Sequence, residues 1–344
     1  MKKWIPFVSA LTLAVLAVSL VGCGQNKEES TEVTKTVVSE AAPKKLQVEA
    51  SFYPMYEFAS QVAGNLADVN LLIPASVEPH DWEPTPQDIG KIEQADLLVY
   101  NGAGMEGWVE QVLAGSSNKN MLAVEASKGI ELMEGAEEEE EHADAEAGHD
   151  HDGESSSSQE EAHEHDHDHG GLDPHVWLSP KLAIEEVRNI EAALIAKAPD
   201  HKDEFTKNAD AYITKLQQLD TDFQKELNET KRKDFITQHA AFGYLAKTYG
   251  LTQVPIAGLS PEQEPSASAM AGVVKFAKEH QVKTIFFETL VSSQVAETIA
   301  KEIGASTAVL NPLEGLTEED QAKHLDYIAV MRSNLEELKK ALNE

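Results

Sequence analysis

The chain alternates short apolar runs with longer amphipathic segments, and this alternation limits its fold class. Between about residues 46 and 310, each run of strand-forming side chains is followed by a segment whose apolar residues recur every three or four positions. Strands separated by helices pair in parallel, because the helix returns the chain to the starting edge of the sheet. The sequence therefore predicts an α/β fold built from βα units.

One predicted helix is much longer than the others and lies between two sets of strands. Its apolar stripe runs from Phe205 to Leu227, which corresponds to roughly 25 residues or about 37 Å at 1.5 Å per residue. Such a helix could join two lobes as a stiff rod. Strands are predicted at 46–52, 68–73, 96–100, 233–237, 253–257, 282–287 and 306–310, and the other helices at 56–62, 85–95, 182–196, 242–249, 266–279, 293–303 and 319–342.

The first residues have the pattern of an export signal. Lys2 and Lys3 precede an apolar stretch at 4–21, as in secretory signal peptides. A membrane-spanning helix is the alternative, but the stretch is near the lower length limit for a span. Leu-Val-Gly-Cys, ending at Cys23, resembles the bacterial lipobox. This resemblance implies that Cys23 is lipidated and becomes the mature N-terminus, with two acyl chains as a membrane anchor.

The domain organisation follows from these segments. The 41% content of hydrophobic residues is enough for folded cores, and about 300 residues beyond the polar tether predict two domains. We expect a signal peptide at 1–22, a lipidated cysteine and tether at 23–45, an N-terminal lobe at 46–200, a linking helix at 201–230 and a C-terminal lobe at 231–344.

An acidic, histidine-rich insertion at 137–171 interrupts the N-terminal lobe. Residues 137–169 contain seven of the thirteen histidines and fifteen carboxylates, without Lys, Arg or a large apolar residue, so disorder is predicted. A solvated acidic tract is one interpretation. Alternation of histidine with acids at the end of the run favours an auxiliary metal-binding loop. Its candidate ligands are His142, His149, His151, His163, His165, His167 and His169.

The net charge of −32 argues against nucleic acid as a partner and suits attraction of cations. Three histidines outside the insertion, His80, His175 and His239, lie just beyond a predicted strand or before a predicted helix. Glu288 directly follows the predicted strand ending at Phe287. Ligands of open α/β sheets bind at the carboxyl ends of the strands, so these four side chains are candidates to converge. Taken singly, each histidine is more commonly a surface or capping residue than a metal ligand.

Several motifs together resemble a known family. They are Pro-His-Asp-Trp-Glu-Pro at 79–84, Asp-Pro-His-Val-Trp-Leu-Ser-Pro at 173–180, Thr-Gln-His-Ala-Ala-Phe-Gly-Tyr at 237–244, Phe-Phe-Glu at 286–288, and the insertion itself. The chain resembles the zinc-specific branch of the metal-binding solute-binding lipoproteins of bacterial ABC importers, within the zinc/manganese group. The resemblance implies two (β/α)4 lobes, a long rigid helix between them and a metal site in the cleft.

The resemblance also implies the ligands and the function. The ligands would be His80, His175, His239 and Glu288, and a third imidazole favours Zn²⁺ over Mn²⁺. A filled tetrahedron leaves no position for a substrate, so the expected function is capture of Zn²⁺ outside the cytoplasm rather than catalysis. A monomer would carry the ion to a membrane permease powered by a separate ATPase. The alternatives are a zinc-dependent surface adhesin and a zinc hydrolase with Glu288 as base.

Overall fold

The computed structural model describes residues 45–135 and 171–344, all within one unit spanning Lys44–Glu344. Cys23, the predicted signal peptide and almost all of the predicted tether lie outside the described residues. So do the seven histidines predicted as an auxiliary metal loop. Among the described residues, no helix combines the length and the apolar character needed to cross a membrane.

The first lobe contains a four-stranded parallel sheet with strand order β2-β1-β3-β4. The strands are β1 (Leu46–Ala50), β2 (Ala67–Leu71), β3 (Leu97–Tyr100) and β4 (Leu122–Glu125), and the helices between them are α1 (Tyr53–Ala63), α2 (Pro86–Ile92) and α3 (Val109–Gly115). The predicted elements of this lobe are confirmed. The short α3 and β4 were not predicted, because their few apolar residues give no sustained period.

The second lobe repeats this topology with strand order β6-β5-β7-β8, again all parallel. Its elements are β5 (Asp234–Thr237), α6 (Gly243–Tyr249), β6 (Thr252–Pro255), α7 (Ala267–Glu279), β7 (Thr284–Phe287), α8 (Gln294–Ile303), β8 (Ser306–Val309), α9 (Glu318–Ala322) and α10 (Tyr327–Ala341). The single helix predicted at 319–342 is wrong. The chain turns at His324, where φ is +54°, and Asp326 then caps α10 by accepting a hydrogen bond from the Ala329 amide at 2.8 Å.

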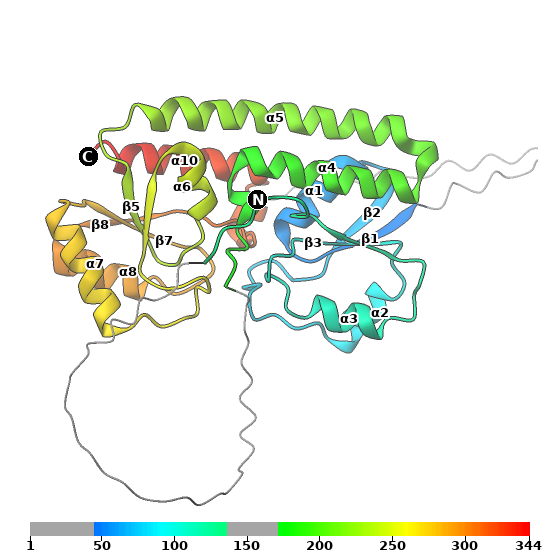
Figure 1. Ribbon diagram of the computed structural model, residues 1–344, viewed down its shortest axis with the longest axis horizontal. Coiled ribbons are helices and arrows are strands. Elements are labelled where there is room, and N and C mark those ends of the chain that lie inside the picture. Colours follow the sequence, from blue (N-terminus) through cyan, green and yellow to red (C-terminus); the bar gives the residue numbers. More distant parts are fainter. Residues whose placement is uncertain (1–44, 136–170) are drawn as a thin grey trace, which may run out of the picture. The chain divides into compact units, whose positions relative to one another are not determined.

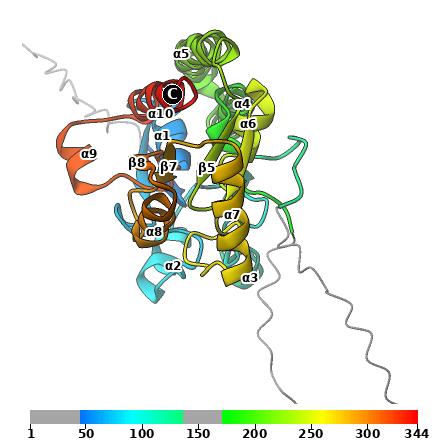
Figure 2. The same ribbon diagram turned by 90° about the vertical axis from the view of Figure 1, so that its left-hand side faces the viewer.

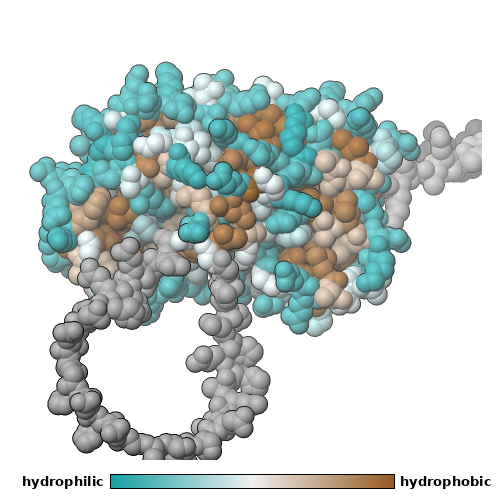
Figure 3. Space-filling model, viewed as in Figure 1, coloured by the Kyte–Doolittle hydropathy of each residue, from teal (hydrophilic) through white to brown (hydrophobic). Residues whose placement is uncertain are grey.

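The predicted long helix is confirmed as α5 (Lys202–Asn228), which follows α4 (Pro180–Lys197). It packs against α1 and α4 of the first lobe and against α6 and α10 of the second, as Figure 1 and Figure 2 show. Its buried stripe is Phe205, Ala209, Tyr212, Ile213, Leu216, Leu219, Phe223 and Leu227. The upper edge of Figure 3, where α5 lies, is predominantly hydrophilic. The helix therefore contributes one apolar face to both lobes.

The two faces of each sheet have different coverings. Leu97 and Val99 of β3 belong to the large core beneath α1, α4 and α5, whereas Leu98 between them packs with residues of α2 and α3. In the second lobe, Phe235 joins the large core and Ile236 packs towards α7 and α8. One hydrophobic core thus extends through both lobes. The predicted fold class, two parallel-sheet α/β lobes with a long helix between them, is confirmed.

Candidate metal centre

The loops at the carboxyl ends of the strands bring together the three histidines expected from the sequence. His80 lies in the loop after β2, and His239 follows β5. His175 immediately precedes the short 3₁₀ helix η1 (Val176–Leu178) that leads into α4. Glu314, in the loop after β8, joins them. One ring nitrogen from each histidine and one carboxylate oxygen of Glu314 all lie within 4.8 Å of one another. Both lobes contribute to this group.

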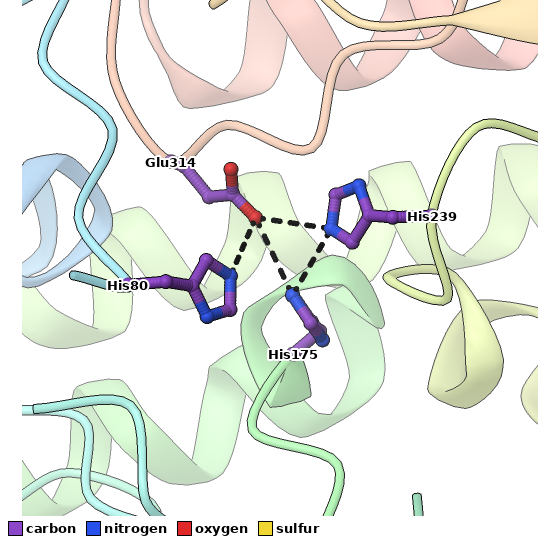
Figure 4. A group of neighbouring side chains, drawn as sticks. All are labelled: His80, His175, His239 and Glu314. Carbon is purple, nitrogen blue, oxygen red and sulfur yellow. Dashed lines mark hydrogen bonds and ion pairs between the residues drawn. The ribbon is translucent and has the colours of Figure 1, made fainter. Parts of the chain in front are cut away.

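Dashed lines in Figure 4 join one carboxylate oxygen of Glu314 to each of the three histidines. This oxygen, Oε1, lies 3.3 Å from Nε2 of His80, 3.3 Å from Nε2 of His175 and 3.4 Å from Nε2 of His239. The Nε2 atoms of His175 and His239 are 3.4 Å apart. A tetrahedral Zn²⁺ ion with bonds of about 2.0–2.1 Å places neighbouring ligand atoms roughly 3.3–3.4 Å apart. These four separations therefore suit a small tetrahedral cation.

Glu288, expected from the sequence as the fourth ligand, lies outside this group. In the paired strands β5 and β7, Thr237 lies opposite Phe286, and two further residues along each chain bring His239 next to Glu288. Oε1 of Glu288 accepts a hydrogen bond from Nδ1 of His239, whereas Nε2 of that ring faces Glu314. Glu288 thus orients the imidazole from behind, and Glu314 occupies the position expected for Glu288.

A carboxylate also fixes the ring of His175. Oδ1 of Asp173 accepts hydrogen bonds from Nδ1 and the backbone N–H of His175, at 2.8 and 2.9 Å. A Cβ atom at Gly243 would lie 2.7 Å from Oδ2 of Asp173, so only glycine leaves room for this carboxylate. Carboxylate bonds to Nδ1 fix the tautomer in which Nε2 is free to bind a metal. His175 and His239 share this arrangement.

His80 is the most exposed member of the group, although its side chain is still only 9% exposed. Its backbone N–H donates to both carboxylate oxygens of Glu78, at 3.0 and 3.1 Å. Burial raises the pKa of Glu78 to about 7, although the His80 amide opposes the shift. Trp82 packs against Trp108 with ring centroids 5.5 Å apart, as expected of a packing residue.

The electrostatics of the group reflect four buried titratable side chains in contact. Burial lowers the pKa of His80. Burial also opposes protonation of His175 and His239, but neighbouring carboxylates outweigh it, so the pKa of His175 is raised and that of His239 reaches about 10. The three imidazoles hold the pKa of Glu314 well below its usual range, against the effect of burial. The neighbouring carboxylates therefore favour a proton on His175 and His239, whereas burial disfavours one on His80.

These observations define a class of protein: two parallel-sheet lobes joined by a long helix, with a buried group of three imidazoles and one carboxylate suited to holding a metal ion. The chain belongs to the family described as zinc-uptake complex component A, periplasmic, whose model matches residues 48–341. This confirms the family resemblance of its motifs. The expectation that the chain is not an enzyme is also confirmed, because the family comprises solute-binding components.

Named relatives agree with this membership. The chain is 49% identical over 341 residues to the high-affinity zinc uptake system protein ZnuA of Bacillus subtilis, covering 99% of this chain and 98% of the relative. It is 43% identical to the zinc-binding lipoprotein AdcA of Streptococcus pneumoniae, covering 100% of this chain but 62% of that longer protein.

Solved structures share the fold. The Zn(II)-bound ZnuA-like domain of Streptococcus pneumoniae AdcA is 42% identical with a TM-score of 0.70, over 88% of this chain and 100% of that one. The laminin-binding protein Lmb of Streptococcus agalactiae is described as bifunctional, with adhesin and metal transporting activity. It is 34% identical with a TM-score of 0.71, over 87% of this chain and 100% of that one.

Proposed function

We propose that this protein captures Zn²⁺ outside the cytoplasm, through His80, His175, His239 and Glu314, and delivers it to a membrane permease. The observation that carries the proposal is that three Nε2 atoms and one carboxylate oxygen lie together, with the oxygen 3.3–3.4 Å from each nitrogen, a separation that fits two corners of a zinc tetrahedron. Glu288 and Asp173 act as hydrogen-bond acceptors that orient two of the rings. The Zn(II)-bound AdcA domain supports the choice of ion.

The composition of the group favours Zn²⁺ over the harder Mn²⁺. Three imidazole nitrogens and a single carboxylate suit a borderline cation, whereas Mn²⁺ prefers more oxygen ligands. Zinc is the cargo here, and the four protein ligands complete its tetrahedron. A zinc hydrolase would need an open position on the metal and a base directed at it. Glu288 does not serve as that base, because it bonds the far side of the His239 ring.

Delivery and attachment belong to the same proposal. A permease and its ATPase would take the ion from the loaded monomer, and the similarity to a protein named for zinc uptake supports this role. A lipid on Cys23 would hold the protein at the outer face of the cytoplasmic membrane, and the lipoprotein name of AdcA supports this anchor. Replacing Cys23 with Ala should then release the protein from the membrane fraction. The histidine-rich insertion would gather zinc as an auxiliary loop.

A zinc-dependent surface adhesin is a second candidate, and the similarity to Lmb favours it. The test is binding of the mature protein to immobilised laminin with and without zinc. Specific binding that disappears with a chelator would support an adhesin role in addition to transport. Equal retention on laminin and on an albumin-coated surface would rule that role out.

A competitive zinc titration of the mature protein tests the main proposal. One tight site is expected, and a variant lacking residues 137–169 should keep it, because all four proposed ligands lie outside that segment. His239→Ala should abolish the tight site, whereas His280→Ala is the matched control on the exposed C-terminal end of α7. Loss of the tight site on deletion of the insertion would show that the insertion supplies essential ligands.

A further inference from the structure

The loop that presents Glu314 has an unusual backbone. Leu313, directly before Glu314, has φ of +59°, which lies in the left-handed region that a branched side chain rarely adopts. Its side chain is fully buried, so it cannot relax towards solvent. A non-glycine residue keeps this conformation only where surrounding contacts impose it. The contacts around residues 311–313 therefore determine where Glu314 lies.

Asn334 of α10 supplies the first of these contacts. Its Nδ2 donates to the Asn311 carbonyl at 2.7 Å, and its Oδ1 accepts from the Asn311 backbone N–H at 2.9 Å. The side chain of Asn311 then accepts a hydrogen bond from the Leu313 N–H at 2.8 Å. Asn334 is 2% exposed, so both of its bonds form away from competing water. A chain of three hydrogen bonds thus links α10 to the residue preceding Glu314.

Trp177 supplies the second contact, from the other lobe. Its indole N–H donates to the Pro312 carbonyl at 2.8 Å. Trp177 lies two residues beyond His175 in the chain. The Tyr327 hydroxyl, at the start of α10, donates to the Trp177 carbonyl at 2.6 Å. The Trp177 and His175 rings also lie against each other, with centroids 5.3 Å apart. The segment that carries His175 is therefore tied directly to the loop that carries Glu314.

We infer that Asn334 and Trp177 are positioning residues that clamp residues 311–313 from the two lobes and so aim the Glu314 carboxylate at the three imidazoles. This inference rests on the proposed zinc site. Neither side chain belongs to the group of metal-ligand atoms. Their contribution is to hold the strained loop that places Oε1 of Glu314 within 3.4 Å of each Nε2. Hydrogen bonds from both lobes therefore hold the loop that carries Glu314.

The test uses Asn334→Ala and Trp177→Phe in the mature protein, with zinc affinity and the visible absorption of bound Co²⁺ as readouts. Zn²⁺ has no d–d spectrum, whereas the Co²⁺ spectrum depends on the number and geometry of the ligands. Trp108→Phe is the matched control. Trp108 is also buried, and its indole nitrogen has no hydrogen-bond partner in the described part of the chain. Glu314→Ala gives the spectrum expected when the fourth ligand is lost.

Both clamp variants should bind zinc about 10- to 100-fold more weakly, as for other residues that orient metal ligands. Their Co²⁺ spectra should shift towards that of Glu314→Ala, while Trp108→Phe keeps the wild-type affinity and spectrum. Wild-type affinity and spectrum in folded Asn334→Ala and Trp177→Phe would overturn the inference. A wild-type protein that does not bind zinc tightly would instead overturn the proposed function. If Asn334→Ala does not fold, Asn334→Asp, which keeps the acceptor to Asn311, provides the same comparison.

Discussion

Glu288 accepts a hydrogen bond from Nδ1 of His239 on the side of the ring opposite the metal-ligand group. The pairing of β5 with β7 brings these two residues together, because both follow adjacent parallel strands at their carboxyl ends. In the strand order β6-β5-β7-β8, the chain proceeds in opposite directions from β5 and from β7. The space between two such strands is where open α/β sheets bind ligands. One carboxylate therefore orients His239 from behind while another, Glu314, faces its Nε2.

Zinc binding should release protons and weaken as the pH falls. The raised pKa of His239, about 10, means that its imidazole holds a proton in the metal-free protein at neutral pH, and zinc must displace that proton. If zinc displaces one proton, its dissociation constant should therefore rise by about tenfold for each unit by which the pH falls below this pKa. Each further proton displaced adds another factor of about ten. Competitive titrations between pH 6 and 9 measure this slope. Because Glu288→Gln removes a carboxylate that raises this pKa, it should flatten the slope. A dissociation constant independent of pH between 7 and 8.5 would contradict this account.

Replacing Glu186 with Met should stabilise the protein. Glu186 on α4 is fully buried, and neither carboxyl oxygen has a hydrogen-bond partner among the described residues. An unsatisfied buried polar group costs roughly 1–3 kcal/mol, which Glu186→Met should recover as unfolding free energy in urea at pH 8. The exposed neighbour Glu185 is the control, and Glu185→Met should change stability by less than about 0.5 kcal/mol.

The benefit of Glu186→Met should also depend on pH. Burial raises the pKa of Glu186 well above its ordinary value, so the folded protein keeps a proton that the unfolded chain loses above about pH 4.5. The free energy of unfolding of the wild type therefore falls as the pH rises above about 4.5. Glu186→Met has no carboxyl group at this position, so its stability does not show this fall. The difference between variant and wild type should grow from pH 5 to pH 8. A constant difference would show that Glu186 ionises in the folded state as it does in the unfolded chain.

The shared core beneath α5 should be sensitive to cavities. Leu216 of α5 is fully buried in the core that extends through both lobes. Leu216→Ala should lower the free energy of unfolding by about 2–5 kcal/mol, the range for buried leucines. Gln217→Ala, on the exposed face of the same helix, should have little effect. Chemical denaturation in the absence of zinc separates this change from metal binding, and equal effects of the two substitutions would contradict the packing described for α5.

Most of the fold could be predicted from the sequence, because long apolar periods mark its helices and strands. The stripe of α5 and the strand–helix alternation gave the two lobes. The short elements α3 and β4 gave no such signal. The C-terminal helix was predicted as one because the residues around His324 do not interrupt the apolar period strongly, and only the conformation of the backbone shows the break.

The candidate site was predictable for its histidines and not for its carboxylate. His80, His175 and His239 stand in distinctive motifs, whereas Glu314 lies in an irregular loop, Asn-Pro-Leu-Glu-Gly, without an aromatic or histidine neighbour. The sequence favours Glu288 because it directly follows a strand and stands in one of the motifs that resemble the family. The same rule, applied a few residues beyond the strand predicted at 306–310, would have raised Glu314 as a candidate. Glu288 contacts Nδ1 of His239 and Glu314 contacts its Nε2, and local sequence carries no information about which carboxylate lies on which side of the ring.

The most direct measurement is a zinc titration of Glu314→Gln beside Glu288→Gln, two substitutions of equal size and charge change. If Glu314 is the fourth ligand, Glu314→Gln should weaken zinc binding by more than about 100-fold and alter the Co²⁺ spectrum. Glu288→Gln should weaken binding by about 10- to 100-fold and leave the spectrum that of four ligands. The reverse order, with Glu288→Gln abolishing the site and Glu314→Gln nearly silent, would show that Glu288 is the fourth ligand and contradict the account.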